Sequence, residues 1–160
     1  MRDLVGATRP GARPDRRGIL PRRLVTEADV RDVPVIGRLD EVGAWFYEAD
    51  RAVVRAGLSG ALPGRELAAG VGYATGSEPI DLPWARRYAV VEAMPLRVKA
   101  VRAWLRARAI GRVTVKKRGV SVDPESLRRE LTTRAEGHAT LVVTSVAGHP
   151  VAIVVDPATR

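Results

Sequence analysis

The residues of this chain whose types and spacing could support a chemical function are cations. Between residues 86 and 129 there are thirteen lysines and arginines against three acidic residues, a local net charge of +10. Lys99, Arg102 and Arg106 are spaced i, i+3, i+7, so a helix would carry them as one basic stripe. Lys116, Lys117 and Arg118 lead into a glycine, where the backbone can come close to a ligand.

Three consecutive cations repel one another and gain nothing for folding alone, so we expect an anion at residues 116–118. The stripe and the cluster together favour phosphate contacts with a polyanion, and the alternative is an ordinary solvated surface. The electrostatic attraction to phosphate groups does not depend on the base sequence, so it does not identify which nucleic acid is bound. The predicted contact residues are Lys99, Arg102, Arg106, Lys116, Lys117 and Arg118, with Arg86, Arg87 and Arg112 at the margin.

Enzymatic chemistry finds little support in the same sequence. There is no cysteine, which excludes thiolate catalysis and cysteine-based metal sites. The two histidines, His138 and His149, are predicted to be solvent-exposed, one before a strand and one in a hairpin turn. The glycine-rich stretch 70–76 lacks the G-x-G-x-x-G spacing and is interpreted as a turn. We therefore expect no catalytic residue, no cofactor and no metal in this chain.

Length and charge agree with a small basic protein. The 160 residues carry a net charge of +9, which favours a nucleic-acid partner. No apolar run reaches the ~18 residues of a membrane helix, and no signal peptide is recognisable, so a cytoplasmic protein without membrane contact is expected.

Residues 1–40 form the first of three zones. The segment 1–23 is predicted to be a disordered basic tail, and we favour a linker over a phosphate-binding arm. A connector with room for one short strand follows it.

The third zone, 88–156, has the clearest periodicity and predicts the order β-α-β-α-β-β. The expected strands are 88–93, 112–118, 139–147 and 151–155, and the expected helices are 96–109 and 123–134. Gly111 is predicted to end the first helix in a left-handed conformation, and Asp123 followed by Pro124 is a strong helix start. The predicted fold is a two-layer α+β domain with a four-stranded sheet and two helices on one face.

The second zone, 41–87, is weakly periodic and is predicted to be a short, mainly helical segment. Asp50 is a candidate N-cap for a helix over 51–58, and a second helix could cover 65–69. The adjacent aromatics Trp45, Phe46 and Tyr47 cannot all lie on one face, so at least one should anchor this zone to the next.

Three segments resemble a known family. The segment W-F-Y-E-A-D at 45–50 with V-V-R-A-G-L at 53–58, and Y-A-T-G-S-E-P at 73–79, are similar to two of its moderately specific motifs. The most specific similarity is K-K-R-G-V at 116–120 with D-P-E-S-L-R-R at 123–129. Together they resemble the C-terminal region of bacterial, chiefly actinobacterial, class I S-adenosylmethionine-dependent methyltransferases. That region is a ferredoxin-like segment followed by a THUMP-like domain.

The resemblance covers residues 42–155 and implies RNA binding, by analogy with THUMP domains, with transfer or ribosomal RNA as the expected partner. S-adenosylmethionine would be bound only by a Rossmann-type catalytic domain, of which these residues show no cofactor loop. The first hypothesis is a non-catalytic THUMP-like module that binds or presents RNA for methylation. The second is a protein-interaction module that docks through the aromatic segment 45–47 to a methyltransferase subunit or to another copy. A complete small methyltransferase is a distant third.

Overall fold

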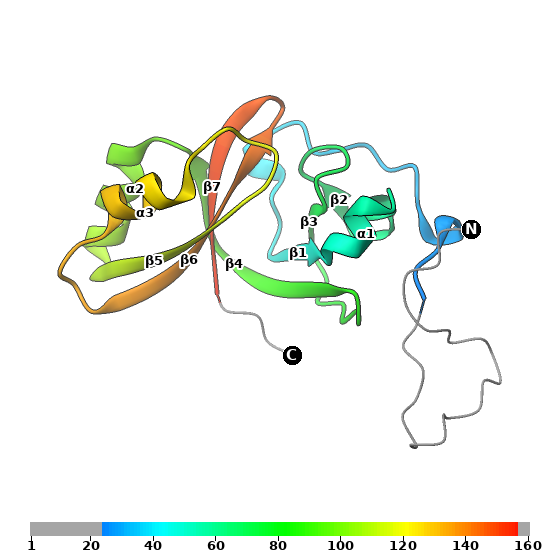
Figure 1. Ribbon diagram of the computed structural model, residues 1–160, viewed down its shortest axis with the longest axis horizontal. Helices are drawn as coiled ribbons and strands as arrows, with labels where there is room; N and C mark the ends of the chain where they lie inside the picture. Colours follow the sequence, from blue (N-terminus) through cyan, green and yellow to red (C-terminus); the bar gives the residue numbers. More distant parts are fainter. Residues whose placement is uncertain (1–23, 157–160) are drawn as a thin grey trace, which may run out of the picture.

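The computed structural model describes residues 24–156 (Figure 1), so the predicted tail at 1–23 lies outside the described residues. The described part contains α1 (Arg51–Arg55), α2 (Val98–Ala107), α3 (Pro124–Leu131) and 3-10 turns at Glu27–Asp29, Leu39–Glu41 and Ser59–Ala61. Its strands are β1 (Trp45–Ala49), β2 (Arg65–Glu66), β3 (Tyr73–Gly76), β4 (Ala85–Pro95), β5 (Ile110–Lys117), β6 (Gly137–Val146) and β7 (His149–Val155).

The sheet has seven strands among the described residues, in the order β2-β3-β1-β4-β7-β6-β5. The predicted four-stranded sheet is therefore too small. Strands β4, β7, β6 and β5 are the four predicted ones, and β1 to β3 extend the sheet beyond them. The long strand β4 makes this possible, because its first part pairs with β1 and its last part with β7. A bulge between Val90 and Glu92 separates the two parts, and bulges bend and twist a strand.

The order β-α-β-α-β-β predicted for the third zone is confirmed by β4, α2, β5, α3, β6 and β7. Strands β5 and β6 run parallel, while β7 is antiparallel to both β6 and β4. Both helices cover the same face of this half of the sheet, as predicted (Figure 1). Val101, Leu105, Leu127 and Leu131 from the helices pack there on β6 and β7 side chains such as Leu141.

The face of β6 and β7 that carries no helix packs against aromatic side chains of the second zone. Phe46 has no exposed surface, and its ring centroid lies 5.0 Å from that of Tyr73 and 6.1 Å from that of Tyr88. These rings share one core with Val142 and Ile153. The prediction that an aromatic residue anchors the second zone to the third is therefore confirmed by Phe46.

Tyr47 points to the other side of β1, into a separate core with Val53 and Trp84. Because Phe46 and Tyr47 are both fully buried, and Trp45 lies under the Arg87 guanidinium, the aromatic segment does not offer a free docking surface. The proposed docking through residues 45–47 is therefore wrong. Strand β1 is a central strand with partners on both edges, and its two faces are buried in two different cores, Phe46 in one and Tyr47 in the other.

The prediction of a mainly helical second zone is also wrong. Residues 45–49 and 73–76 are strands, and Arg65 and Glu66 form β2 instead of a helix. The helix that follows Asp50 ends at Arg55, and Gly57 adopts φ +72° two residues later. Strand pairing decides this region, because β1 lies between β3 and β4 and its local sequence carries no helical or strand period.

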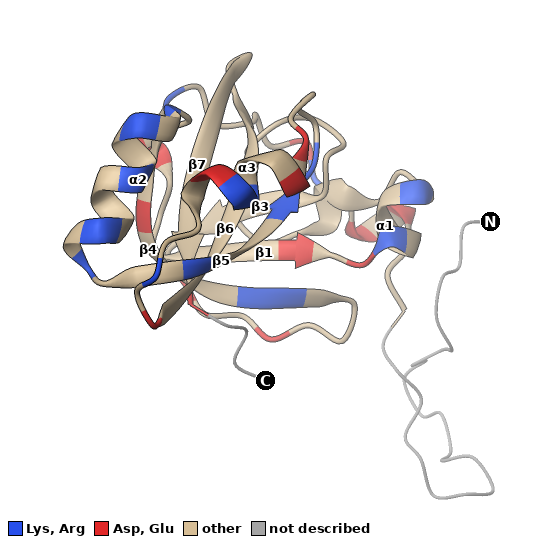
Figure 2. Ribbon diagram, turned by 60° about the vertical axis from the view of Figure 1, so that its left-hand side comes forward, with Lys and Arg blue, Asp and Glu red and all other residues tan. Residues whose placement is uncertain are grey.

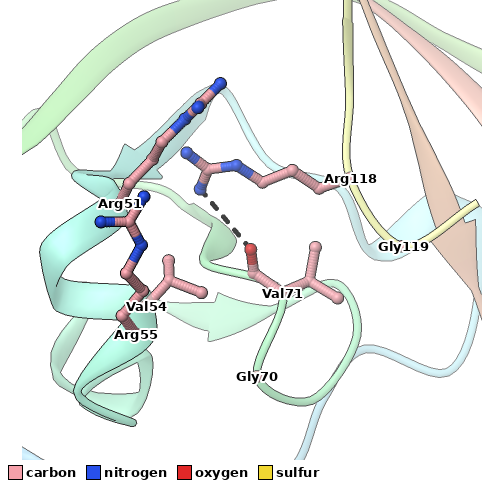
Figure 3. Close-up of a pocket in the computed structure, with 7 residues that line it drawn as sticks. All are labelled: Arg51, Val54, Arg55, Gly70, Val71, Arg118 and Gly119. Atoms are coloured by element: carbon pink, nitrogen blue, oxygen red, sulfur yellow. Dashed lines mark hydrogen bonds between the residues drawn. The ribbon is translucent and has the colours of Figure 1, made fainter.

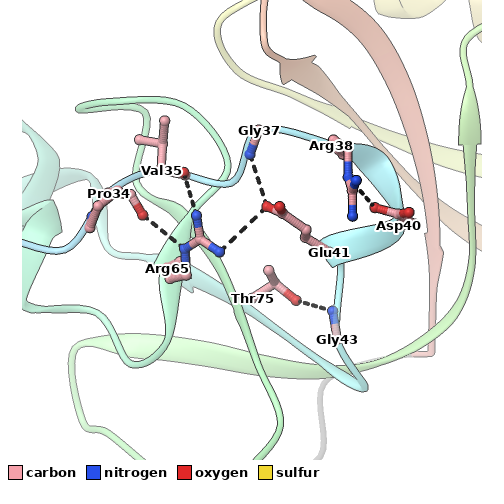
Figure 4. A network of polar contacts seen from close by, with 9 residues as sticks. All are labelled: Pro34, Val35, Gly37, Arg38, Asp40, Glu41, Gly43, Arg65 and Thr75. Carbon is pink, nitrogen blue, oxygen red and sulfur yellow. Dashed lines mark hydrogen bonds and ion pairs between the residues drawn. The ribbon is translucent and has the colours of Figure 1, made fainter.

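The described part of the connector contains no strand and is held to the sheet by polar contacts (Figure 4). The Arg65 guanidinium donates hydrogen bonds to the carbonyl oxygens of Pro34 (2.9 Å) and Val35 (2.8 Å). It also pairs with Glu41 Oε2 at 3.4 Å, and the same oxygen accepts from the Gly37 N–H at 2.9 Å. Ile36 is thereby carried into the same core as Phe46.

The predicted ends of the helices and the hairpin are only partly correct. Asp123 does cap α3, with Pro124 at the first helical position, but α3 ends at Leu131 instead of 134. The left-handed residue after α2 is Ala109 (φ 55°) and not Gly111. The β6–β7 hairpin turns at Ala147 and Gly148, both with positive φ, because Val146 already pairs with His149.

The cap at Asp123 leads to a prediction on pH. The Ser126 hydroxyl donates to Asp123 Oδ2 at 2.6 Å and, with the N–H groups of Glu125 and Ser126, lowers the pKa of this carboxyl. A carboxyl with a lowered pKa in the folded state stabilises the fold above its unfolded pKa of about 3.9, and this stabilisation is lost as the pH falls through the folded pKa. Asp123→Ala should therefore lower the Tm at pH 7, and the difference from wild type should narrow at pH 3.

Thermal unfolding followed by circular dichroism measures both differences. Asp123→Asn is the control, because an asparagine accepts the capping hydrogen bond without a titrating charge. If the Tm difference between wild type and Asp123→Ala is the same at pH 7 and pH 3, the ionised Asp123 carboxylate does not stabilise the fold as a cap.

Candidate nucleic-acid interface

The basic stripe on α2 is present, but its members differ in their availability. Lys99 and Arg106 are exposed and have no side-chain partner among the described residues. Arg102 instead donates to the backbone oxygen of Glu130 near the end of α3, through Nε at 2.9 Å and through a terminal nitrogen. Arg102 therefore ties the two helices together, and of the stripe only Lys99 and Arg106 are without a partner in the described part of the chain.

Lys116 has a carboxylate partner from the other half of the molecule. Its ammonium group lies 3.1 Å from Glu48 Oε1 on β1 and 5.8 Å from the centre of the Tyr88 ring. The two side chains of this ion pair are 28% and 13% exposed. The pair links β5 to β1 and is partly shielded from solvent.

Arg118 is held even more firmly. Its guanidinium donates to the carbonyl oxygens of Ala49 (3.0 Å) and Gly72 (3.2 Å) and lies 4.8 Å from the centre of the Tyr73 ring. Burial raises the pKa of the Tyr73 hydroxyl well above its usual range; nearby Glu48 raises it further, and Arg118 opposes that effect. The Tyr73 ring beside Arg118 is therefore uncharged at any physiological pH.

These contacts correct the expectation that three adjacent cations gain nothing for folding. Side chains alternate across a strand, so Lys116 and Arg118 turn toward β1 while Lys117 turns to the other side. Two of the three therefore hold the halves of the protein together. Lys117 alone is exposed and has no partner in the described part of the chain.

Several predicted cations meet in one hollow of about 410 Å³, which we call the junction pocket. Figure 2 shows basic residues along this region, on β4, β5 and α1, and separately on α2. Arg86 is exposed there and has no partner among residues 24–156. The charged residues that line the junction pocket are Glu48, Asp50, Arg51, Arg86, Lys116, Lys117 and Arg118.

Arg51 also belongs to this group, although no sequence pattern predicted it. It is the first residue of α1, 67 positions before Arg118, and no spacing rule connects the two. Its only sequence signal was its place directly after a predicted N-cap. Tertiary packing of α1 beside the end of β5 brings it to the pocket.

Two marginal predictions lie elsewhere. Arg87 is on the face of β4 opposite Arg86, where it pairs with Asp81 at 3.2 Å and lies 4.8 Å from the Trp45 ring centre; it is 16% exposed. Arg112 lines a separate hollow of about 460 Å³ with Arg128 and His138. Neither residue joins the junction pocket.

The glycine-rich stretch 70–76 forms a loop at 70–72 followed by strand β3. Gly70 and Gly72 adopt left-handed conformations in a loop that leads into strand β3, and not into a helix as a phosphate-binding loop would. Within residues 24–156 no group of three or more histidines or carboxylates is placed to hold a metal ion. None of the helices described is sufficiently long and apolar to cross a bilayer.

Comparison with known proteins finds a family that is similar to the second half of the chain. Residues 85–157 match the family described as THUMP domain-like, a range that runs from β4 to β7. Two curated relatives from Mycobacterium tuberculosis, strains CDC 1551 and H37Rv, are described as uncharacterised S-adenosylmethionine-dependent methyltransferases. Each is 35% identical over 109 residues, which is 65% of this chain and 30% of the relative.

A crystal structure of a protein described as a methyltransferase from Porphyromonas gingivalis W83 shares the fold. Its TM-score is 0.65 at 18% identity, over 96% of this chain and 37% of that one. The chain thus spans about a third of the length of these relatives. Residues 85–157 are similar to the THUMP-like family, and the 109 matched residues are homologous to part of proteins described as S-adenosylmethionine-dependent methyltransferases.

Proposed function

We propose that this chain is a non-catalytic RNA-binding module that binds or presents substrate RNA for a S-adenosylmethionine-dependent methyltransferase domain. The observation that carries the proposal is a set of exposed cations that have no carboxylate partner within residues 24–156, on or beside the segment that matches the THUMP-like family. They lie on α2 and at the junction pocket: Lys99, Arg106, Arg86 and Lys117. THUMP domains as a class bind RNA, which agrees with this charge.

The basic residues of this region differ in whether the protein itself supplies them with partners. Arg102, Lys116 and Arg118 have protein partners, which explain their presence without a ligand. Lys99, Arg106, Arg86 and Lys117 have no such partner among the described residues, and they add to a local excess of positive charge. Phosphate groups would satisfy them, and each contact would release counterions from the RNA.

The residues present do not fit S-adenosylmethionine. The glycine-rich loop at 70–72 enters strand β3 and has no helix N-terminus behind it. Within residues 24–156 no acidic residue follows a strand at the spacing that holds a ribose. We therefore assign the cofactor to a methyltransferase domain outside this sequence, on the same or another chain. In this proposal residues 88–156 are the RNA-binding domain, and residues 41–87 support it.

The test is the salt dependence of binding to transfer RNA and to ribosomal RNA fragments. The variant Lys99→Gln, Arg106→Gln, Arg86→Gln, Lys117→Gln should lower the slope of log K against log salt by about 3, at 0.7 to 0.9 per lost contact. The same relation predicts an affinity loss of about 1,000-fold at 0.1 M salt.

The control variant is Arg38→Gln with Arg129→Gln, because these exposed arginines contact only neighbours on their own turn, Asp40 and Ser126. It should lose far less affinity than the fourfold variant. If the wild type and the fourfold variant have the same slope of log K against log salt, these four residues do not contact the RNA.

A further inference from the structure

A second hollow adjoins the junction pocket and involves residues outside the THUMP-like match. It has a volume of about 440 Å³ and lies between α1, the loop before β3 and the end of β5 (Figure 3). We call it the α1 pocket. Its walls include Arg51, Arg55, Val54, Val71 and Arg118.

Three guanidinium groups gather at one side of the α1 pocket, and no carboxylate lines it (Figure 3). Arg51 and Arg55 lie one helical turn apart on α1, are exposed, and have no side-chain partner within residues 24–156. Like charges at i, i+4 destabilise a helix, and α1 is only five residues long. Their proximity to Arg118 adds like-charge repulsion, which a bound anion would relieve.

Arg118 gives the pocket a fixed charged edge. Its donors are directed at Ala49 O and Gly72 O and its plane lies on Tyr73, so its position is set before any ligand arrives. The loop before β3 also packs closely against α1 at Gly72. A side chain at Gly72 would collide with Val54 and would stand 2.9 Å from the Arg118 guanidinium.

The opposite walls are apolar. Val54 and Val71 are only partly buried, and their side chains face the pocket (Figure 3). A ligand that fits both walls has an anionic group next to an uncharged, largely apolar body. A nucleotide has this composition, because its phosphate can accept paired hydrogen bonds from guanidinium groups while its sugar and base contact aliphatic side chains.

The continuity of the two pockets favours a nucleotide within an RNA strand. Arg51 and Arg118 line both pockets, so a backbone that passes Arg86 and Lys117 in the junction pocket continues directly to Arg55. We propose that the α1 pocket holds one nucleotide of the bound RNA, with its phosphate on Arg51 and Arg55 and its nucleoside against Val54 and Val71. This inference rests on the proposed RNA-binding function and extends the interface beyond the THUMP-like domain.

The test is the full chain carrying Arg51→Gln and Arg55→Gln, with transfer RNA as the probe in fluorescence anisotropy at 0.1 M salt. Loss of two phosphate contacts should lower the affinity about 25-fold and the salt slope by about 1.5. The matched control, Arg38→Gln with Arg129→Gln, removes the same charge away from both pockets. If the two double variants bind alike, the α1 pocket is not part of the interface.

The outcomes separate this proposal from the general one. Reduced binding by the fourfold variant of the previous section, with unchanged binding by Arg51→Gln/Arg55→Gln, overturns the α1 pocket alone. An absence of RNA binding by wild type at low salt overturns the RNA-binding function itself.

A second measurement tests the nucleoside. Adenosine 5′-monophosphate should shift the methyl NMR signals of Val54 and Val71 in the wild type, whereas inorganic phosphate at the same concentration should leave them nearly unchanged. Identical shifts with both would overturn the apolar part of the site, since a bare anion would then account for it.

Discussion

Replacing Gly111 with alanine is expected to cost more than about 3 kcal/mol of the free energy of unfolding, at the upper end for forced overpacking. A Cβ at this position would stand 2.7 Å from the carbonyl carbon and 2.8 Å from the nitrogen of Ala135, and closer still to the Ala135 oxygen. Real Cβ atoms do not approach backbone so closely, and backbone cannot give way as a flexible side chain can.

The backbone around Gly111 is tied at several points. Its carbonyl accepts from the Thr133 N–H at 2.9 Å, and the Gly137 N–H donates to Ala109 O at 3.0 Å. These bonds start the parallel pairing of β5 with β6, at the point where the register shifts. Moving Ala135 to admit a methyl group would therefore disturb the strand that carries Lys116, Lys117 and Arg118.

Urea unfolding of Gly111→Ala measures the change, and Gly37→Ala is the control. Nothing lies within 4 Å of a Cβ built at Gly37, so that variant should change the free energy of unfolding by no more than about 0.5 kcal/mol. Equal unfolding midpoints for the two variants would show that the close approach at Ala135 does not exist in solution.

Arg118→Met is expected to lower the free energy of unfolding by about 2–4 kcal/mol. The substitution removes charged hydrogen bonds to two carbonyls, of about 1.5–3 kcal/mol each in favourable cases, and a cation–π contact of about 1 kcal/mol, partly offset by the buried methionine. The loss corresponds to a Tm decrease of about 10 °C for a domain of this size. The cause is a weaker junction between β5 and strands β1 and β3.

Lys117→Met is the matched control, because it removes a neighbouring cation that has no partner in the described chain. It should leave the Tm within about 2 °C of wild type and still reduce RNA affinity. If Arg118→Met and Lys117→Met had the same Tm, Arg118 would have no structural role. The cations at residues 116–118 would then be explained by anion binding alone.

The secondary structure of residues 88–156 could be predicted from the sequence, and that of residues 41–87 could not. In residues 88–156 local signals agree with the tertiary structure: Leu127 and Leu131 share one helix face, and Asp123 with Pro124 starts that helix. In residues 41–87 the strands are short and buried on both faces, so no alternation marks them. Tyr47 and Phe46 are both fully buried although they point in opposite directions.

The candidate site divides in the same way. Sequence reasoning found the basic segments correctly as segments, but it could not tell which cations already have partners. Glu48 lies 68 positions from Lys116, and Ala49 lies 69 positions from Arg118. Such contacts arise only when the sheet brings β1 and β5 together across β4, β7 and β6, and no local sequence pattern indicates this.

By itself, the sequence determined the charge of this protein, the absence of thiol chemistry, and the order of strands and helices from β4 to β7. These properties depend on composition and on short-range periodicity, which the chain carries locally. Only the tertiary structure decided that the sheet has seven strands, that Arg102, Lys116 and Arg118 serve the fold, and that Arg51 and Arg55 stand beside Arg118. The physical reason is that side-chain partners are chosen by packing across the sheet, between residues that are far apart along the chain.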